Sequence, residues 1–280
     1  MVGTRAQTGT IELAPGVFAF IQEGGATNAG FIVGDDGALV IDALMTRALA
    51  KQLIGEVKRV TPKPVRFLVY THFHGDHTFG GELFLPAAIV GHRECRDELI
   101  DKWEASVKRF CTNRPEFADE FRKVKPAPPE AVFTERMTLH LGQRQIELIY
   151  FGRAHTRGDI FIHLPQDRVL FSGDAVVNGR APAAMDGYIS SWIAVLERAQ
   201  GLDVETLVPG HGLIGGKGTI AEQMAFFSEL KRQVRAGFDA GKSVEQTAKD
   251  LKLPQFAAWP NISNLDNHIR RLYMEFRGEL

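Results

Sequence analysis

The sequence predicts an α+β protein built as an αββα sandwich, in which two mixed β-sheets stack face to face and helices cover their outer faces. Two observations predict it. Short apolar runs typical of strands, followed by helical segments, occupy the first half of the chain, and the same succession returns in the second half. Strands of this kind bury their apolar faces by packing into layers with another sheet or with helices.

The first half contains strand-like runs separated by strong turn signals, such as Pro15-Gly16 and Gly24-Gly25. An amphipathic helix is predicted at 45–59, where apolar residues recur at spacings of three and four. The predicted strands are 11–13, 17–21, 29–33, 38–42 and 65–70.

Helical segments at 92–110 and 115–123 form an insertion that ends at a proline-rich stretch, 126–129. The second run of strands follows at 131–133, 137–141, 145–150, 160–164, 169–171 and 205–208, with a helix at 190–200. From 219 onward the pattern is helical, with a break near 252–260. No repeat or low-complexity linker divides the chain. We therefore expect one domain over residues 1–280, with a core at about 10–215 and a helical C-terminal extension at about 216–280.

Composition excludes several classes of function. The chain has 33 Lys+Arg against 34 Asp+Glu, a net charge of −1, so no bulk charge favours nucleic acid or a membrane surface. No apolar run reaches the length needed to span a bilayer, and 1–7 contain no hydrophobic signal core. Two cysteines do not make a disulfide framework. We expect a cytoplasmic protein that acts on a small molecule. Its oligomeric state, a homodimer included, stays open.

Residues 71–77, Thr-His-Phe-His-Gly-Asp-His, hold three of the nine histidines of the chain directly after a predicted strand. Alternate side chains of an extended backbone share a face, so His72 and His74 can point to the same place. Gly75 lets the chain turn, and Asp76 and His77 follow around the bend. This short stretch can offer ligands to two adjacent metal ions.

Three more potential ligands stand where a predicted strand hands over to a glycine-rich turn. His155 follows the strand at 145–150, Asp174 follows 169–171, and His211 follows 205–208. Each position combines a rigid strand end with a coordinating side chain. Taken singly these are ordinary loop residues, but together with 72–77 they indicate a metal site.

These four segments resemble the metallo-β-lactamase superfamily, whose pattern is His-x-His-x-Asp-His, then a His, an Asp and a final His at strand ends. The resemblance covers about residues 10–215 and implies the metallo-β-lactamase fold. It implies that His72, His74 and His155 bind one metal, that Asp76, His77 and His211 bind a second, and that Asp174 bridges them.

Nitrogen-rich ligands suit zinc, two ions per chain, although iron or manganese can occupy such sites. Two ions about 3.5–4 Å apart activate a bridging hydroxide as a nucleophile. Asp76 is then the candidate catalytic residue, because it can accept a proton from the attacking water. Asp42, at the end of the strand at 38–42, is expected to orient a metal-binding histidine.

The predicted function is a dinuclear zinc hydrolase of a small ester, thioester, lactone or β-lactam. β-Lactamases of this superfamily usually have Cys or Ser where this chain has Asp174, and lactonases have Tyr where it has Val177. Two alternatives on the same fold stay open: an iron-dependent oxidoreductase that resembles persulfide dioxygenases, and a phosphodiesterase.

The loop at 176–188 is expected to line the pocket, with Arg180 and Tyr188 as candidate substrate contacts. His268 is a candidate that approaches the site from the C-terminal helices. Three aromatic residues of the helical segments are further candidates for the pocket wall, although helical aromatics are more often core: Trp103, Phe110 and Trp259.

Overall fold

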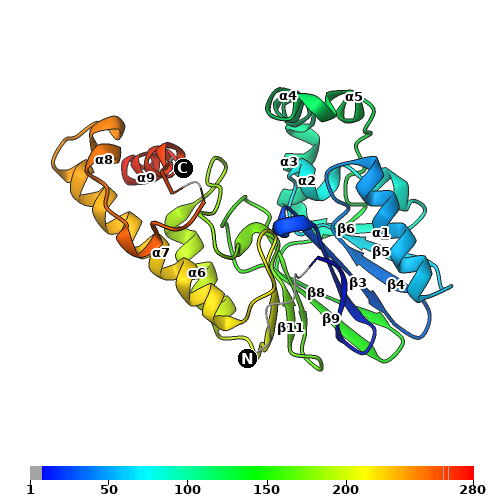
Figure 1. Ribbon diagram of the computed structural model, residues 1–280. Coiled ribbons are helices and arrows are strands. Elements are labelled where there is room, and N and C mark those ends of the chain that lie inside the picture. The colour runs from blue at the N-terminus through cyan, green and yellow to red at the C-terminus, as the bar shows by residue number, and fades with distance from the viewer. Residues whose placement is uncertain (1–7, 261, 264) are drawn as a thin grey trace.

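The computed structural model describes residues 8–260, 262–263 and 265–280, and it confirms the αββα sandwich (Figure 1). The sequence interpretation of 1–7 concerns residues outside this range. Within the described residues the first sheet has seven strands in chain order: β1 (Gly9–Ala14), β2 (Val17–Ile21), β3 (Asn28–Val33), β4 (Ala38–Ile41), β5 (Val65–Val69), β6 (Ala88–His92) and β7 (Ala131–Phe133). The second sheet has the order β12-β11-β10-β9-β8, from β8 (Arg136–Leu141), β9 (Arg144–Ile149), β10 (Phe161–Leu164), β11 (Val169–Phe171) and β12 (Thr206–Val208).

Both sheets change from antiparallel to parallel pairing, and the site lies where they do so. Strands β1 to β4 form an antiparallel meander, and β4, β5, β6 and β7 are parallel neighbours. In the second sheet, β8 to β11 are antiparallel, and β12 lies parallel to β11. Parallel strands end at one edge of a sheet, and loops at that edge commonly form binding sites.

Two predictions for the first sheet were wrong. Strand β6 was missed, because its apolar run is short and lies between Pro86 and Gly91, and the helix predicted from 92 begins only after it. Strand β7 was grouped with the second run of strands, but it pairs in parallel with β6 and forms the edge of the first sheet. The insertion between these two strands consists of α3 (Arg93–Asp101), α4 (Trp103–Asn113) and α5 (Ala118–Phe121).

Strand β2 shows how the layers form. Val17, Ala19 and Ile21 belong to the core between the sheets, whereas Phe18 and Phe20 belong to the core beneath α1 (Arg47–Val60). Every residue of the strand is buried, as expected for a sheet covered on both faces.

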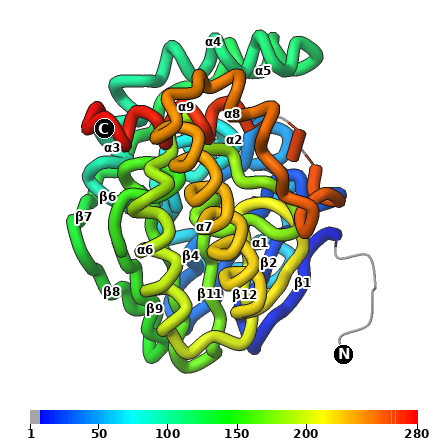
Figure 2. Tube along the Cα trace, turned by 90° about the vertical axis from the view of Figure 1, so that its left-hand side faces the viewer, coloured from blue at the N-terminus to red at the C-terminus, as the bar shows by residue number. Residues whose placement is uncertain are grey.

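The outer face of the second sheet is covered by α6 (Ile189–Gln200) and α7 (Lys217–Asp239), which lie side by side in front of it in Figure 2. The chain continues through α8 (Val244–Asp250) to α9 (Asp266–Arg277), which packs against both α6 and α7. No helix among the described residues is long and apolar enough to cross a bilayer.

The three aromatic residues proposed for the pocket wall are packed in helical clusters. Trp103 and Phe110 both contact the Phe79 ring beneath the insertion, and Trp259 contacts Phe226 and Phe256. Their apolar surface is used for helix packing.

Trp192 of α6 connects the helical layer to the candidate site. Its side chain is fully buried, and its indole Nε1–H donates to the carbonyl oxygen of Ala175 at 2.8 Å, next to Asp174. The ring also lies edge-on to His155, with 5.5 Å between the centroids.

We expect Trp192→Ala to lower the free energy of unfolding by about 3–5 kcal/mol, because it leaves a large cavity. Trp192→Phe should cost about 1 kcal/mol, since it keeps the aromatic packing while Gln223 still donates to the Ala175 carbonyl. Denaturant unfolding of both variants tests this. Equal losses would show that the volume of Trp192 is not what stabilises the layer.

Candidate metal centre

The candidate ligands lie in loops at the ends of core strands. After β5, His72 lies in a bend at 71–73, and His74 is the extended residue before the short helix α2 (Gly75–Thr78), which carries Asp76 and His77. Gly75 is needed for a reason that the sequence did not reveal: a Cβ there would lie 2.3 Å from the Phe79 ring. The chain turns because a helix starts at this point.

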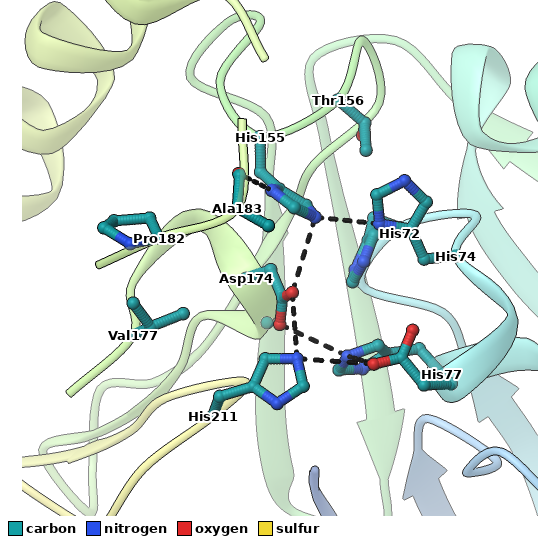
Figure 3. Close-up of polar contacts among 12 residues, drawn as sticks. His72, His74, His77, His155, Thr156, Asp174, Val177, Pro182, Ala183 and His211 are labelled. Carbon is teal, nitrogen blue, oxygen red and sulfur yellow. Dashed lines mark hydrogen bonds and ion pairs between the residues drawn. The ribbon is translucent and has the colours of Figure 1, made fainter. Parts of the chain in front are cut away.

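The second sheet supplies the other three residues. His155 lies in the loop between β9 and β10, Asp174 in the turn Gly173–Ala175 after β11, and His211 directly after β12. Figure 3 shows these side chains pointing toward His72, His74 and His77 from the opposite side of the site.

All seven predicted ligands come together in two groups whose candidate donor atoms lie within 4.8 Å of one another. The first group is His72, His74, His155 and Asp174, and the second is Asp76, His77 and His211. Asp174 stands between them: its Oδ2 lies 3.4 Å from His155 Nε2 and 3.1 Å from His211 Nε2, and its Oδ1 lies 3.2 Å from His77 Nε2. This is the position expected for a bridging carboxylate.

Each of the five histidines uses one ring nitrogen in a hydrogen bond that points away from the centre. The outer partners are Thr71 Oγ1 for His72 Nδ1, Asp186 Oδ2 for His74 Nε2, Asp42 Oδ2 for His77 Nδ1, Ala183 O for His155 Nδ1, and Ala26 O for His211 Nδ1. The other nitrogen of every ring faces the centre, where His155 Nε2 and His74 Nδ1 lie 2.8 Å apart. Outer hydrogen bonds of this kind fix the tautomer of metal-binding histidines.

Several inward atoms lack a hydrogen bond although they are buried. Among the described residues these include His72 Nε2, His77 Nε2 and Asp174 Oδ1. Buried polar atoms are nearly always paired, so such a cluster indicates an absent partner that accepts lone pairs. The residues present thus fit a pair of metal ions.

One carboxylate sets the tautomers of two histidines. Asp42 Oδ2 accepts from His77 Nδ1–H at 2.8 Å and from the Thr71 hydroxyl at 2.8 Å. Because the hydroxyl donates its proton to Asp42, it accepts from His72 Nδ1–H, 3.0 Å away. Asp42 is 1% exposed and adopts a left-handed backbone conformation, φ 61°. The expectation that it orients a histidine agrees with this geometry.

The charges of the centre are strongly coupled. Burial lowers the pKa values of His72, His74 and His155, which keeps these rings neutral. Burial also acts on His211, but the Asp174 and Asp76 carboxylates prevail and raise its pKa to about 9. Asp174, buried between His211 and His77, has its pKa held well below the usual value by these two rings. A metal ion that binds here must displace protons from the second group.

The sequence did not identify Asp186 as part of the site. One of its oxygens accepts from His74 Nε2–H at 3.0 Å, and the other accepts from Lys102 Nζ at 2.9 Å. Burial opposes its ionisation, but His74 and Lys102 lower its pKa. The only sequence signal was the Asp186-Gly187 pair within the loop at 176–188, which is expected to line the pocket. Asp186 ties that loop to a candidate ligand on one side and to the insertion on the other.

The two candidate substrate contacts lie in different surroundings. Arg180 lines a cavity beside Asp174 and His211. Tyr188 is not among the residues that line it, and its ring lies between the guanidinium groups of Arg153 and Arg271, 5.2 and 4.9 Å from the centroid. His268 also lines the cavity and donates from Nε2 to the Pro182 carbonyl at 2.7 Å.

We expect Asp42→Asn to lower zinc affinity about 10–100-fold, because an amide donor facing His77 Nδ1 favours the tautomer whose Nε2 cannot coordinate. Competition with a chromophoric chelator measures the affinity. Asp36→Asn, at an exposed turn, removes the same charge far from the centre and serves as the control. Equal affinities for both variants would contradict the role of Asp42.

We expect Gly210→Ala to lose metal binding, because the new Cβ would lie 2.0 Å from Asp174 Oδ1 and 2.7 Å from the Asp174 backbone nitrogen. Gly218→Ala is the matched control, since a Cβ at this exposed position of α7 meets nothing within 4 Å. Metal content after dialysis tests the pair. Full metal content in Gly210→Ala would show that Asp174 tolerates displacement.

The model of the metallo-beta-lactamase superfamily matches residues 23–211, more than half of the chain. The alpha subunit of a 2,4-dinitroanisole O-demethylase from Nocardioides sp. (strain JS1661) is 29% identical over 184 residues, which are 64% of this chain and 51% of that protein. The acyl-coenzyme A thioesterase MBLAC2 of Gallus gallus is 29% identical over 219 residues, 71% of this chain and 78% of that protein. A type 2 metallo-beta-lactamase from Bacillus sp. (strain 170) is 24% identical over 66% of each chain.

Solved structures share the fold. The sec-alkylsulfatase Pisa1 from Pseudomonas sp. gives a TM-score of 0.79 at 18% identity, over 98% of this chain and 51% of that chain. A metallo-beta-lactamase from Pontibacter korlensis gives 0.62 at 20% identity, over 79% and 99%. The chain thus spans about half the length of the O-demethylase subunit and of the alkylsulfatase. The family match includes all seven residues of the two groups, and the chain belongs to the metallo-beta-lactamase superfamily.

Proposed function

We propose that this chain is a zinc-dependent hydrolase with two ions per chain, acting on a small ester, thioester, lactone or β-lactam. One observation carries the proposal: five histidines each direct the ring nitrogen that is not used in an outer hydrogen bond at a common centre, and Asp174 stands between two groups of donors. Zinc prefers such nitrogen-rich sites, although iron and manganese also accept them.

His72, His74 and His155 would hold one ion, Asp76, His77 and His211 the other, and Asp174 would touch both. When bound, the ions supply Lewis acidity for the substrate oxygen and lower the pKa of a water toward neutrality.

Asp76 is the carboxylate best placed to move a proton. Its side chain is 18% exposed, whereas Asp174 is 6% exposed, so Asp76 can reach both the centre and solvent. Its Oδ2 lies 3.3 Å from His211 Nε2. In the proposed reaction the Asp76 carboxylate accepts a proton from the attacking water and delivers it to the leaving group.

The cavity beside the second group would bind the substrate. Its volume is about 320 Å³, at the small end for ligand sites, and most of its lining is small and apolar. Small, largely apolar acyl compounds fit this space. The names of two relatives, a thioesterase and a beta-lactamase, support an acyl substrate.

We expect Asp76→Ala and His211→Ala to lose hydrolysis and about half of the bound zinc, because both changes remove donors of the second group only. Elemental analysis and a panel of lactone, β-lactam and thioester substrates test this, with His140→Ala, a histidine on edge strand β8, as the control. If metal-free protein hydrolyses the panel as fast as zinc-loaded protein, the proposal fails.

The same preparations separate the two alternatives. Native iron together with an oxygen-dependent product would establish the oxidoreductase. Turnover of bis(4-nitrophenyl) phosphate, without turnover of the acyl panel, would establish the phosphodiesterase.

A further inference from the structure

The cavity beside Asp174 and His211 carries a positive charge on its wall in addition to the candidate metal ligands at its end. The cavity touches Asp174 and His211 at one end, and the loop at 177–185 and helix α9 form its sides. Most of the wall is apolar: Val177, Ala181, Pro182, Ala183, Ala184 and Met185. Arg180 is the one guanidinium group among the lining residues.

Arg180 is half-buried, and within the described part of the chain its guanidinium has no hydrogen bond, ion pair or aromatic contact. Three other cations that contact the same loop have partners. Lys102 and Arg109 lie 2.9 and 3.7 Å from the Asp186 carboxylate, and Arg271 donates to the Gly187 carbonyl at 2.6 Å. A half-buried, unpaired cation loses part of its hydration, which an anionic ligand can replace.

The lining offers Arg180 no carboxylate partner of its own. The one acidic residue there is Asp174, whose oxygens face His77, His155 and His211. Once metal ions occupy the two groups, the whole end of the cavity is positive, which strengthens the preference for an anion.

The loop that carries Arg180 is held in place on both sides of it. Before it, Asn178 N donates to the His211 carbonyl at 2.9 Å, and Asn178 Nδ2 donates to Leu213 O at 2.8 Å. After it, Ala181 N donates to Pro260 O at 3.3 Å, and His268 Nε2 donates to Pro182 O at 2.7 Å. The backbone at Arg180 is therefore positioned before a substrate arrives, which lowers the entropic cost of binding.

We propose that Arg180 binds an anionic group of the substrate, so that the preferred substrates are small acyl compounds with a carboxylate, sulfate or phosphate near the scissile bond. The apolar wall takes the uncharged part of the substrate. This assignment rests on the proposed hydrolase function. Arginine suits the role because its planar fork pairs with oxyanions through two parallel hydrogen bonds.

The test compares two esters that differ mainly in one charge, mono-4-nitrophenyl succinate and 4-nitrophenyl butyrate, on zinc-loaded protein. For Arg180→Met we expect the ratio of kcat/KM, succinate over butyrate, to fall about 10–100-fold, the size of a lost hydrogen bond to a charged group. Arg180→Lys keeps the charge but lacks the planar guanidinium, so its kcat/KM ratio should lie between those of the wild type and Arg180→Met. Arg136→Met, at an exposed arginine on edge strand β8, removes the same charge and should keep the wild-type ratio.

A binding measurement separates the two proposals. Zinc-loaded protein is titrated calorimetrically with succinate, inorganic sulfate and inorganic phosphate. The anion with the lowest Kd is the preferred one. For that anion we expect Arg180→Met to raise the Kd at least about 10-fold. An unchanged ester ratio and unchanged Kd values in Arg180→Met would overturn the anion subsite while leaving hydrolysis intact. Arg180-dependent binding without hydrolysis of either ester, or of the lactone, β-lactam and thioester panel, would support the subsite and refute the hydrolase.

Discussion

The hydrogen bonds of Asp42 are the constraint on which the geometry of the centre depends. Its carboxylate accepts from His77 directly and fixes His72 through the Thr71 hydroxyl. It also accepts from the Thr71 backbone N–H at 2.8 Å, which ties the end of β5 to the end of β4. A single buried carboxylate at the end of β4 thus orients one ring of each group, and both rings lie after β5. Its left-handed backbone conformation is compatible with this role, because aspartate tolerates that region better than most residues.

The fold brings the site together at one edge, where loops from the strand ends of both sheets meet. The first sheet contributes 72–77, and the second contributes His155, Asp174 and His211. Each of the two groups therefore contains residues from both sheets. Close packing across the seam maintains the distances: Gly210 is so near to Asp174 that a methyl group would not fit, and Gly25 has equally little space beside the Gly212 backbone.

Much of this arrangement was predictable from the sequence, for identifiable reasons. Ligands such as His72 and His211 stand in short motifs after apolar strands. The apolar pattern identifies each strand, and the glycines nearby mark where it ends. Strand β6 was missed because the four apolar residues between Pro86 and Gly91 carry little periodic signal. Asp186 was missed as a partner of His74 because the two residues are 112 positions apart, and only the tertiary structure joins them.

The contacts of α9 with the cavity loop have a consequence for the order in which the protein is completed during synthesis. All seven residues of the two groups have been made once His211 leaves the ribosome. The carbonyls of Pro182 and Gly187, however, receive their donors His268 and Arg271 only after α9 has emerged and docked. The candidate metal centre and the cavity beside it thus receive their last contacts at different times. Changes in α9 can therefore reshape the cavity loop during evolution while the seven candidate ligands stay as they are.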